Sequence, residues 1–151
     1  PTKEDILFSD HLALELSLAE ALAQRPVGSE ALDVLRDFLV ESLSRFDDQA
    51  RVRWQIVRHD PLLRSHQRAR QAEFGKVIAA AIALDLREEV DDLRPQLVTA
   101  AVIAAFTATY EHRFSVRSRA ASREQAVAVI DEAITFLRGG LEAIRAFPKP
   151  Y

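Results

Sequence analysis

The spacing of apolar residues along this chain is helical throughout. Near the carboxyl end, Ile130, Ile134, Leu137, Leu141 and Ile144 follow one another at alternating steps of four and three residues, which places them on one side of a helix. No stretch alternates apolar and polar residues cleanly enough to predict a strand. The four glycines and six prolines also leave little material for hairpin turns. The pattern therefore predicts an all-α protein.

Local start and stop signals divide the chain into six helices. The clearest boundary is Asp60–Pro61, an N-cap residue followed by a proline at the first helical position. Ser122 and Gln125 form a capping box that starts the last helix, of roughly 25 residues. Two further helices are predicted over about residues 3–24 and about 29–46, and Asp47 or Asp48 opens a short third one. The helix that starts at Pro61 reaches about residue 84, and residues 85–92 are a predicted loop. The next helix has Pro95 in its first turn and reaches about residue 114.

The last two predicted helices carry more apolar surface than one core needs. The segment Leu97–Tyr110 is apolar or small on nearly every side, and a helix of that kind must be buried all round. The final helix has a second apolar stripe beside the first, made by Val129, Ala133, Phe136, Gly140 and Phe147. We expect these two helices to pair with an identical pair from a second chain in a four-helix dimer interface, which includes Ala101, Ala105, Ile130, Ile134, Leu137, Leu141 and Ile144. The alternative is a large monomeric core with both helices at its centre.

Composition excludes several other classes of protein. A chain of 151 residues with 48% apolar content fits one domain, and without cysteine it has neither a disulfide nor a thiolate metal site. The net charge of −3 argues against a field that attracts nucleic acid or anionic lipid as a whole, although a local patch could still do so. The sequence contains no signal peptide and no apolar run long enough for a membrane span, so we expect a cytoplasmic protein with no membrane partner.

The opening residues carry a family resemblance. Pro1–Thr2–Lys3–Glu4–Asp5–Ile6–Leu7–Phe8 resembles the end of the DNA-binding domain of TetR-type transcriptional regulators, where the connecting helix begins. Within that family, the stretch 53–83 around Arg58–His59–Asp60–Pro61–Leu62–Leu63–Arg64 is similar to regulators of the mycofactocin system and to acyl-CoA-responsive regulators.

The resemblance implies a domain organisation and a partner. Residues 1–8 would be the remnant of the DNA-binding domain and the start of the connecting helix, and residues 3–151 the six-helix ligand-binding and dimerisation domain, whose last two long helices form a dimeric four-helix bundle. A helix-turn-helix head of about fifty residues would precede them and bind operator DNA. Lys3 stands where the family places a phosphate-contacting lysine; the alternative is an ordinary solvated lysine.

The resemblance also implies an effector held inside each subunit, whose binding tilts the first helix and releases a repressor from its operator. Aromatic and apolar side chains with a few polar groups could line such a cavity. The candidates are Phe38, Ser42, Trp54, Val57, Arg58, Phe74, Ile78, Ile103, Phe106, Thr107 and Tyr110. Each of these aromatic residues could instead be ordinary core, and the alternative function is a structural or protein-interaction dimer without a ligand pocket.

A basic segment indicates the chemistry of the effector. Residues 51–76 contain seven basic side chains against two acidic ones, a local net charge of +5. Guanidinium groups bind phosphates and carboxylates, so the predicted effector is a small hydrophobic or acyl-CoA-like molecule with an anionic head. The alternative is a solvated helix face.

We expect neither a cofactor nor catalysis. The four histidines, at positions 11, 59, 66 and 112, are not arranged in a Glu-x-x-His or His-Glu-x-x-His motif, so metal binding is not predicted. There is no phosphate-binding glycine loop, and no spacing of Ser, His and acidic residues suggests a nucleophile.

Overall fold

The computed structural model describes residues 2–45, 48–114 and 122–150, in which all regular structure is helical. Seven α-helices and one 3₁₀ turn follow one another: α1 (Lys3–Leu7), α2 (Ser9–Ala23), α3 (Ala31–Ser42), η1 (Leu43–Arg45), α4 (Asp48–His59), α5 (Pro61–Leu86), α6 (Leu93–Phe114) and α7 (Arg123–Ala146). The all-α prediction is confirmed for this part of the chain. Phe46 and Asp47, proposed as a helix end and a helix start, lie outside the described residues.

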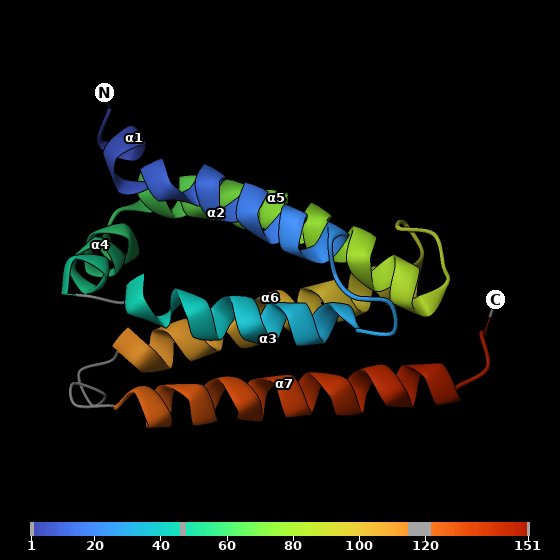
Figure 1. Ribbon diagram of the computed structural model, residues 1–151. Helices are drawn as coiled ribbons and strands as arrows, with labels where there is room; N and C mark the ends of the chain where they lie inside the picture. Colours follow the sequence, from blue (N-terminus) through green and yellow to red (C-terminus); the bar gives the residue numbers. More distant parts are fainter. Residues whose placement is uncertain (1, 46–47, 115–121, 151) are drawn as a thin grey trace.

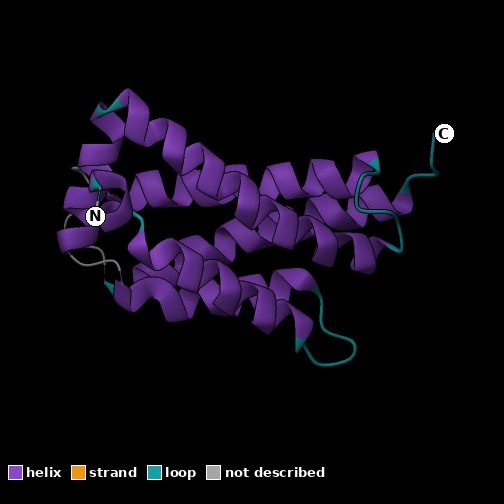
Figure 2. Ribbon diagram, turned by 90° about the horizontal axis from the view of Figure 1, so that it is seen from above, coloured by secondary structure: helices purple, strands orange, loops and turns teal. Residues whose placement is uncertain are grey.

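The long helices lie in layers along one axis (Figure 1). α2 and α5 form one side, α3 and α6 the middle, and α7 the opposite side, while α4 lies near the end from which the chain begins. α5 packs on α6, α6 on α7, α2 on α5, and α3 on α7. The view from above shows the same long helices packed side by side as a bundle (Figure 2).

Two helix starts are formed by the residues that the sequence indicated. The Asp60 carboxylate accepts hydrogen bonds from the backbone N–H groups of Leu62 and Leu63, with Pro61 in the first turn. The Ser122 hydroxyl accepts from the Gln125 backbone N–H, and the Gln125 side chain accepts from the Ser122 N–H. Such local signals need no tertiary contact, because they satisfy N–H groups that every helix leaves unpaired.

The first predicted helix is divided in two. Phe8 separates α1 from α2, with φ −116° and ψ 13°, and its side chain is buried with Val57 and Leu63. A continuous helix over residues 3–24 was therefore wrong at this residue. The break lets the Phe8 ring pack against α4 and α5, and burying the ring there is favourable. No local signal in residues 3–24 predicts this contact.

α3 begins at Ala31, later than the expected start at about residue 29, because Ser29 does not cap it. The Ser29 hydroxyl donates to the Pro26 carbonyl at 2.8 Å. Glu30 is the N-cap instead, in a capping box with Asp33.

Two hydrophobic clusters stabilise the bundle, and they share no residue. The main cluster takes buried side chains from α2, α3, α5, α6 and α7, with Leu32, Ile82 and Val102 completely covered. The small cluster consists of Phe8, Val57 and Leu63, with Leu7 packed against it. The end of the bundle near α1 and α4 thus has its own core.

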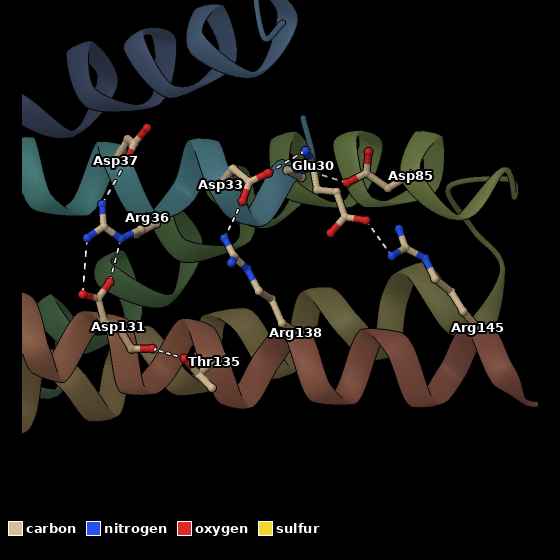
Figure 3. A network of polar contacts seen from close by, with 10 residues as sticks. Glu30, Asp33, Arg36, Asp37, Asp85, Asp131, Thr135, Arg138 and Arg145 are labelled. Carbon is tan, nitrogen blue, oxygen red and sulfur yellow. Dashed lines mark hydrogen bonds and ion pairs between the residues drawn. The ribbon is translucent and has the colours of Figure 1, made fainter. Parts of the chain in front are cut away.

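Ion pairs also connect α3 to α7 (Figure 3). Arg36 binds Asp131 at 2.6 Å, and Arg138 binds Asp33. Arg145 binds Glu30 at 2.6 Å. At the end of α5, the Asp85 carboxylate accepts from the Ala31 backbone N–H at 2.7 Å and binds Arg25 at 2.7 Å, so this one side chain joins the ends of α2, α3 and α5. None of the described helices is long and apolar enough to cross a membrane.

Candidate functional site

Three aromatic rings connect α4 with the end of α6. The ring centroids of Trp54 and Phe114 are 5.9 Å apart, and those of Tyr110 and Phe114 are 6.0 Å apart. Both distances lie within the range at which aromatic pairs attract one another. Phe114 is buried, while Trp54 is half-buried, so this aromatic group is covered by protein on one side and accessible on another.

Further half-buried phenylalanines come from three other helices. Phe38 on α3, Phe74 on α5 and Phe106 on α6 each pack against the main cluster without belonging to its buried part. On the other side of the aromatic group, Val57 on α4 is buried in the small cluster. Several of the predicted ligand residues are therefore apolar side chains that the bundle covers only in part.

Few polar groups occur among these side chains. The Ser42 hydroxyl donates to the Phe38 carbonyl at 2.7 Å, so its proton is used within α3. The Gln71 side-chain amide donates to the Thr107 hydroxyl at 3.4 Å, which joins α5 to α6 beside Phe74 and Phe106. A ligand in this region would meet a mainly apolar wall with a hydroxyl and an amide as polar anchors.

Tyr110 has a protected hydroxyl. Although 37% of the residue as a whole is exposed, burial raises the pKa of its phenol from 10.0 to about 12, while the positive charge of Arg45 acts in the opposite direction. The phenol consequently stays protonated at neutral pH and can act as a hydrogen-bond donor.

Two arginines accompany the aromatic group. The guanidinium carbon of Arg58 lies 5.1 Å from the centroid of the Trp54 ring, a cation–π contact within α4. Arg45, at the end of η1, is exposed and close enough to Tyr110 to act on its pKa. Positive charge is thus available at the accessible side of the aromatic group.

Not every predicted ligand residue is equally available. Ile78 is only 2% exposed and belongs to the main core, and Val57 is a member of the small one. Arg58 is exposed. The residues that are half-buried are Phe38, Ser42, Trp54, Phe74, Ile103, Phe106 and Thr107.

The sequence interpretation missed three residues of this region. Phe114 follows Tyr110 by one helical turn and could have been found from that spacing. Gln71 precedes Phe74 on the same side of α5 and could have been found in the same way. Arg45 carries no local signal, because only the packing of η1 near α6 brings it to Tyr110.

The stripe assigned to the dimer interface is covered by the chain's own helices. Ile130, Ile134, Leu137 and Leu141 are at most 4% exposed and belong to the main cluster, against which Ala101, Ala105 and Ile144 also pack. The apolar side of α6 and α7 that remains open is the neighbouring one. It carries Leu97, Ala100, Ala104 and Ala108 on α6, and Phe136, Gly139, Gly140, Ala143 and, at its C-cap, Phe147 on α7.

Lys3 lies exposed in the first turn of α1. Among the described residues, no group of three or more histidine, cysteine or acidic side chains could hold a metal ion. The side chain of His11 lies outside the described part of the structure.

The described residues thus form a helical bundle with partly covered aromatic residues and an open apolar face on its last two helices. Residues 29–142 match the family described as the MftR C-terminal domain, of the TetR_C_14 type, and the chain belongs to this family of TetR-type regulator domains. A search of curated proteins found no match. Domains of this family have a regulatory role in ligand binding and dimerisation and are generally not enzymes.

Proposed function

We propose that this domain senses an amphipathic small molecule with an anionic head, of the acyl-CoA type, and that binding releases a TetR-type repressor from its operator. The observation that carries the proposal is the aromatic group of Trp54, Tyr110 and Phe114, which links α4 to the end of α6 and in which Trp54 and Tyr110 are only partly covered. A ligand that binds these partly covered rings displaces no residue of the two buried clusters, so the cost of admitting it is small.

The chemistry of the side chains supports this class of ligand. Phe38, Phe74 and Phe106 offer incompletely buried apolar surface to an acyl chain, at about 0.8 kcal/mol per buried methylene. Arg58, held over the Trp54 ring, and Arg45 offer guanidinium groups to a phosphate or carboxylate.

We further propose that the domain acts as a homodimer through the open apolar side of α6 and α7. Gly139 and Gly140 have open space where a side chain would be, which allows a second helix to approach closely. Phe136 and Phe147 are 73% and 71% exposed, which is costly unless a partner covers them. The DNA-binding head would precede α1, so a shift of α1 would change the spacing of two heads in the dimer.

Ligand binding can be tested through the only tryptophan of the chain, Trp54. We expect palmitoyl-CoA to change its fluorescence and to release or absorb heat in a calorimetric titration, while free coenzyme A and hexadecanol bind at least about tenfold more weakly, a difference of about 1.4 kcal/mol. Arg58→Ala should weaken palmitoyl-CoA binding by a similar factor. Arg87→Asn is the matched control, because Arg87 is an exposed arginine outside this region and asparagine tolerates its positive φ of 56°.

Equal binding of palmitoyl-CoA and hexadecanol would remove the anionic head from the proposal. No binding of either would favour the alternative function, a helical dimer without a ligand site.

A further inference from the structure

A buried carboxylate lies in the turn between α5 and α6. Only 3% of the Glu88 side chain is exposed, and its Oε1 atom is 3.3 Å from Nζ of Lys149 and 3.6 Å from Nη1 of Arg94. The other oxygen, Oε2, is buried without a hydrogen-bond partner in the described part of the chain. A buried carboxylate is stable only when cations compensate its charge. Glu88 therefore holds Arg94 and Lys149 in place, and we call these three residues the clasp.

Arg94 connects the clasp to the end of α7. Its Nη2 group donates a hydrogen bond to the Phe147 carbonyl at 2.8 Å, and its side chain is only 13% exposed. The Phe147 N–H donates to the carbonyls of Ala143 and Ile144, both at 3.3 Å. The backbone of Phe147 is thus bound on both sides, although 71% of the residue is exposed. Its aromatic ring is therefore presented to solvent from a fixed position.

The segment after Phe147 is stiff and leads back to Glu88. Pro148 and Pro150 have a fixed φ angle and no N–H, so the helix cannot continue through them. Lys149 precedes a proline, which favours an extended backbone. A segment of this kind loses less conformational entropy when it closes on Glu88 than a flexible one would. Lys149 thus ties this segment to the turn between α5 and α6.

The clasp lies at one end of the open apolar side of α6 and α7. Phe147 is the last member of a stripe on α7 whose members are four, three and four residues apart, namely Phe136, Gly140, Ala143 and Phe147. Figure 1 shows the turn between α5 and α6 and the end of α7 at the same end of the bundle. Since Arg94 is in the first turn of α6, its bond to Phe147 joins the start of α6 to the end of this stripe.

We propose that the clasp holds Phe147 as a preformed anchor for a second copy of this chain, so that its three charged residues are positioning residues of the dimer. The inference rests on the homodimer proposed above. Aromatic residues are frequent anchors of protein interfaces. A ring whose backbone is already fixed loses less conformational freedom when a partner covers it, which strengthens binding. The clasp therefore raises the affinity of the dimer without contributing apolar surface to it.

The experiment measures the dissociation constant of the dimer by sedimentation equilibrium of the 151-residue chain. Arg94→Ala should weaken the dimer by about tenfold, and Arg94→Lys, which leaves a cation beside Glu88, should restore part of the affinity. The matched control is Arg25→Ala, which removes an arginine of nearly the same exposure, 14%, from its ion pair with Asp85. This control should leave the dissociation constant unchanged.

A double-mutant cycle separates positioning from a structural effect. Phe147→Ala removes the ring itself and should weaken the dimer by at least about tenfold. Because the clasp acts through this ring, adding Arg94→Ala to Phe147→Ala should weaken the dimer no further. A merely structural role of Arg94 would weaken the dimer by the same factor in both backgrounds. Lys149→Ala, at a side chain that is 44% exposed, keeps the test valid if Arg94→Ala does not fold, and should weaken the dimer by about threefold.

Three results would overturn the inference and leave the homodimer standing: a Phe147→Ala or an Arg94→Ala dimer as strong as the wild type, an equal loss in Arg94→Ala and Arg25→Ala, or the same loss from Arg94→Ala with and without the Phe147 ring. A wild-type chain that is monomeric at micromolar concentration would overturn the homodimer and the clasp together. The ligand-sensing proposal is independent of all these outcomes, because no effector is present in the measurements.

Discussion

Gly75 on α5 lies directly against Ile103 on α6: a Cβ at Gly75 would be 3.2 Å from Cδ1 of Ile103. This contact lets the two helices approach closely beside Phe74 and Phe106, at the candidate site. A glycine inside a helix costs about 1 kcal/mol of stability relative to alanine. The packing between α5 and α6 that the close approach permits offsets this cost.

Gly75→Ala should therefore change stability little, because the gain in helix propensity is balanced by the displacement of Ile103. When Ile103→Val has already shortened that side chain, the same Gly75→Ala substitution should stabilise the domain by about 0.5–1 kcal/mol. Urea unfolding of the four proteins of this double-mutant cycle measures the coupling. Additive effects of the two substitutions would show that the contact carries no strain.

Asp85→Ala should be among the most destabilising single substitutions in the domain. The Asp85 and Arg25 side chains are only 7% and 14% exposed, and removing one partner of a buried pair costs about 3–5 kcal/mol. The Ala31 N–H at the start of α3 would also lose its acceptor. Urea unfolding checks this against Asp37→Ala, whose exposed side chain should contribute less than about 0.5 kcal/mol. Equal effects of the two substitutions would contradict the prediction.

Phe136→Glu should convert a dimer into a monomer. The substitution places a charge at the centre of the open apolar side of α7, where a partner's apolar surface would have to cover it. Leu84→Glu is the matched control, because Leu84 on α5 is exposed to the same degree, 73%, but lies off that side. Sedimentation equilibrium distinguishes the outcomes. A wild-type chain that is monomeric at micromolar concentration would refute the homodimer.

Tyr110 should titrate far above an ordinary tyrosine. Tyr151→Phe leaves Tyr110 as the only tyrosine, and its phenolate absorbance should reach half its final value near pH 12. Because the pKa is raised in the folded state, the stability that Tyr110 contributes is complete below its unfolded value of 10.0 and is lost as pH increases through the folded value. Arg45→Ala should raise the pKa further. A midpoint near pH 10 in a folded protein would show that the hydroxyl is hydrated.

The ion pair of Asp131 with Arg36 should contribute only above acidic pH. Arg36 lowers the pKa of Asp131 from 3.8, mainly by donating a hydrogen bond, so the contribution is complete above that unfolded value and is lost as pH falls through the lowered one. Both side chains are more than a third exposed (35% and 47%), so solvent screening keeps the effect small. The difference in unfolding free energy between the wild type and Asp131→Asn, measured from neutral pH down to about pH 2, should shrink at the acidic end. A constant difference would mean that the pair is not formed in solution.

The helices and most of their boundaries could be predicted from the sequence. Local interactions form the helix caps at Asp60 and Ser122 and the break before α6. Such interactions join residues that are close in the sequence, so they can be predicted from the sequence alone. The family resemblance at the opening residues and at residues 53–83 agrees with the match over residues 29–142. The candidate ligand residues were predicted in part, because helical spacing identifies the side of a helix but not its neighbour.

Helical periodicity determined by itself that this chain is a bundle with two apolar stripes on its last helix. Only tertiary packing decided which stripe is inside: Ile130 and its neighbours face the chain's own core, while Phe136 and Gly140 remain open. Packing also decided the break at Phe8, whose ring is buried between α4 and α5. The physical reason is the same in both cases. Periodicity fixes the direction of a side chain relative to its own helix, whereas the free energy of burial depends on which other helix lies there.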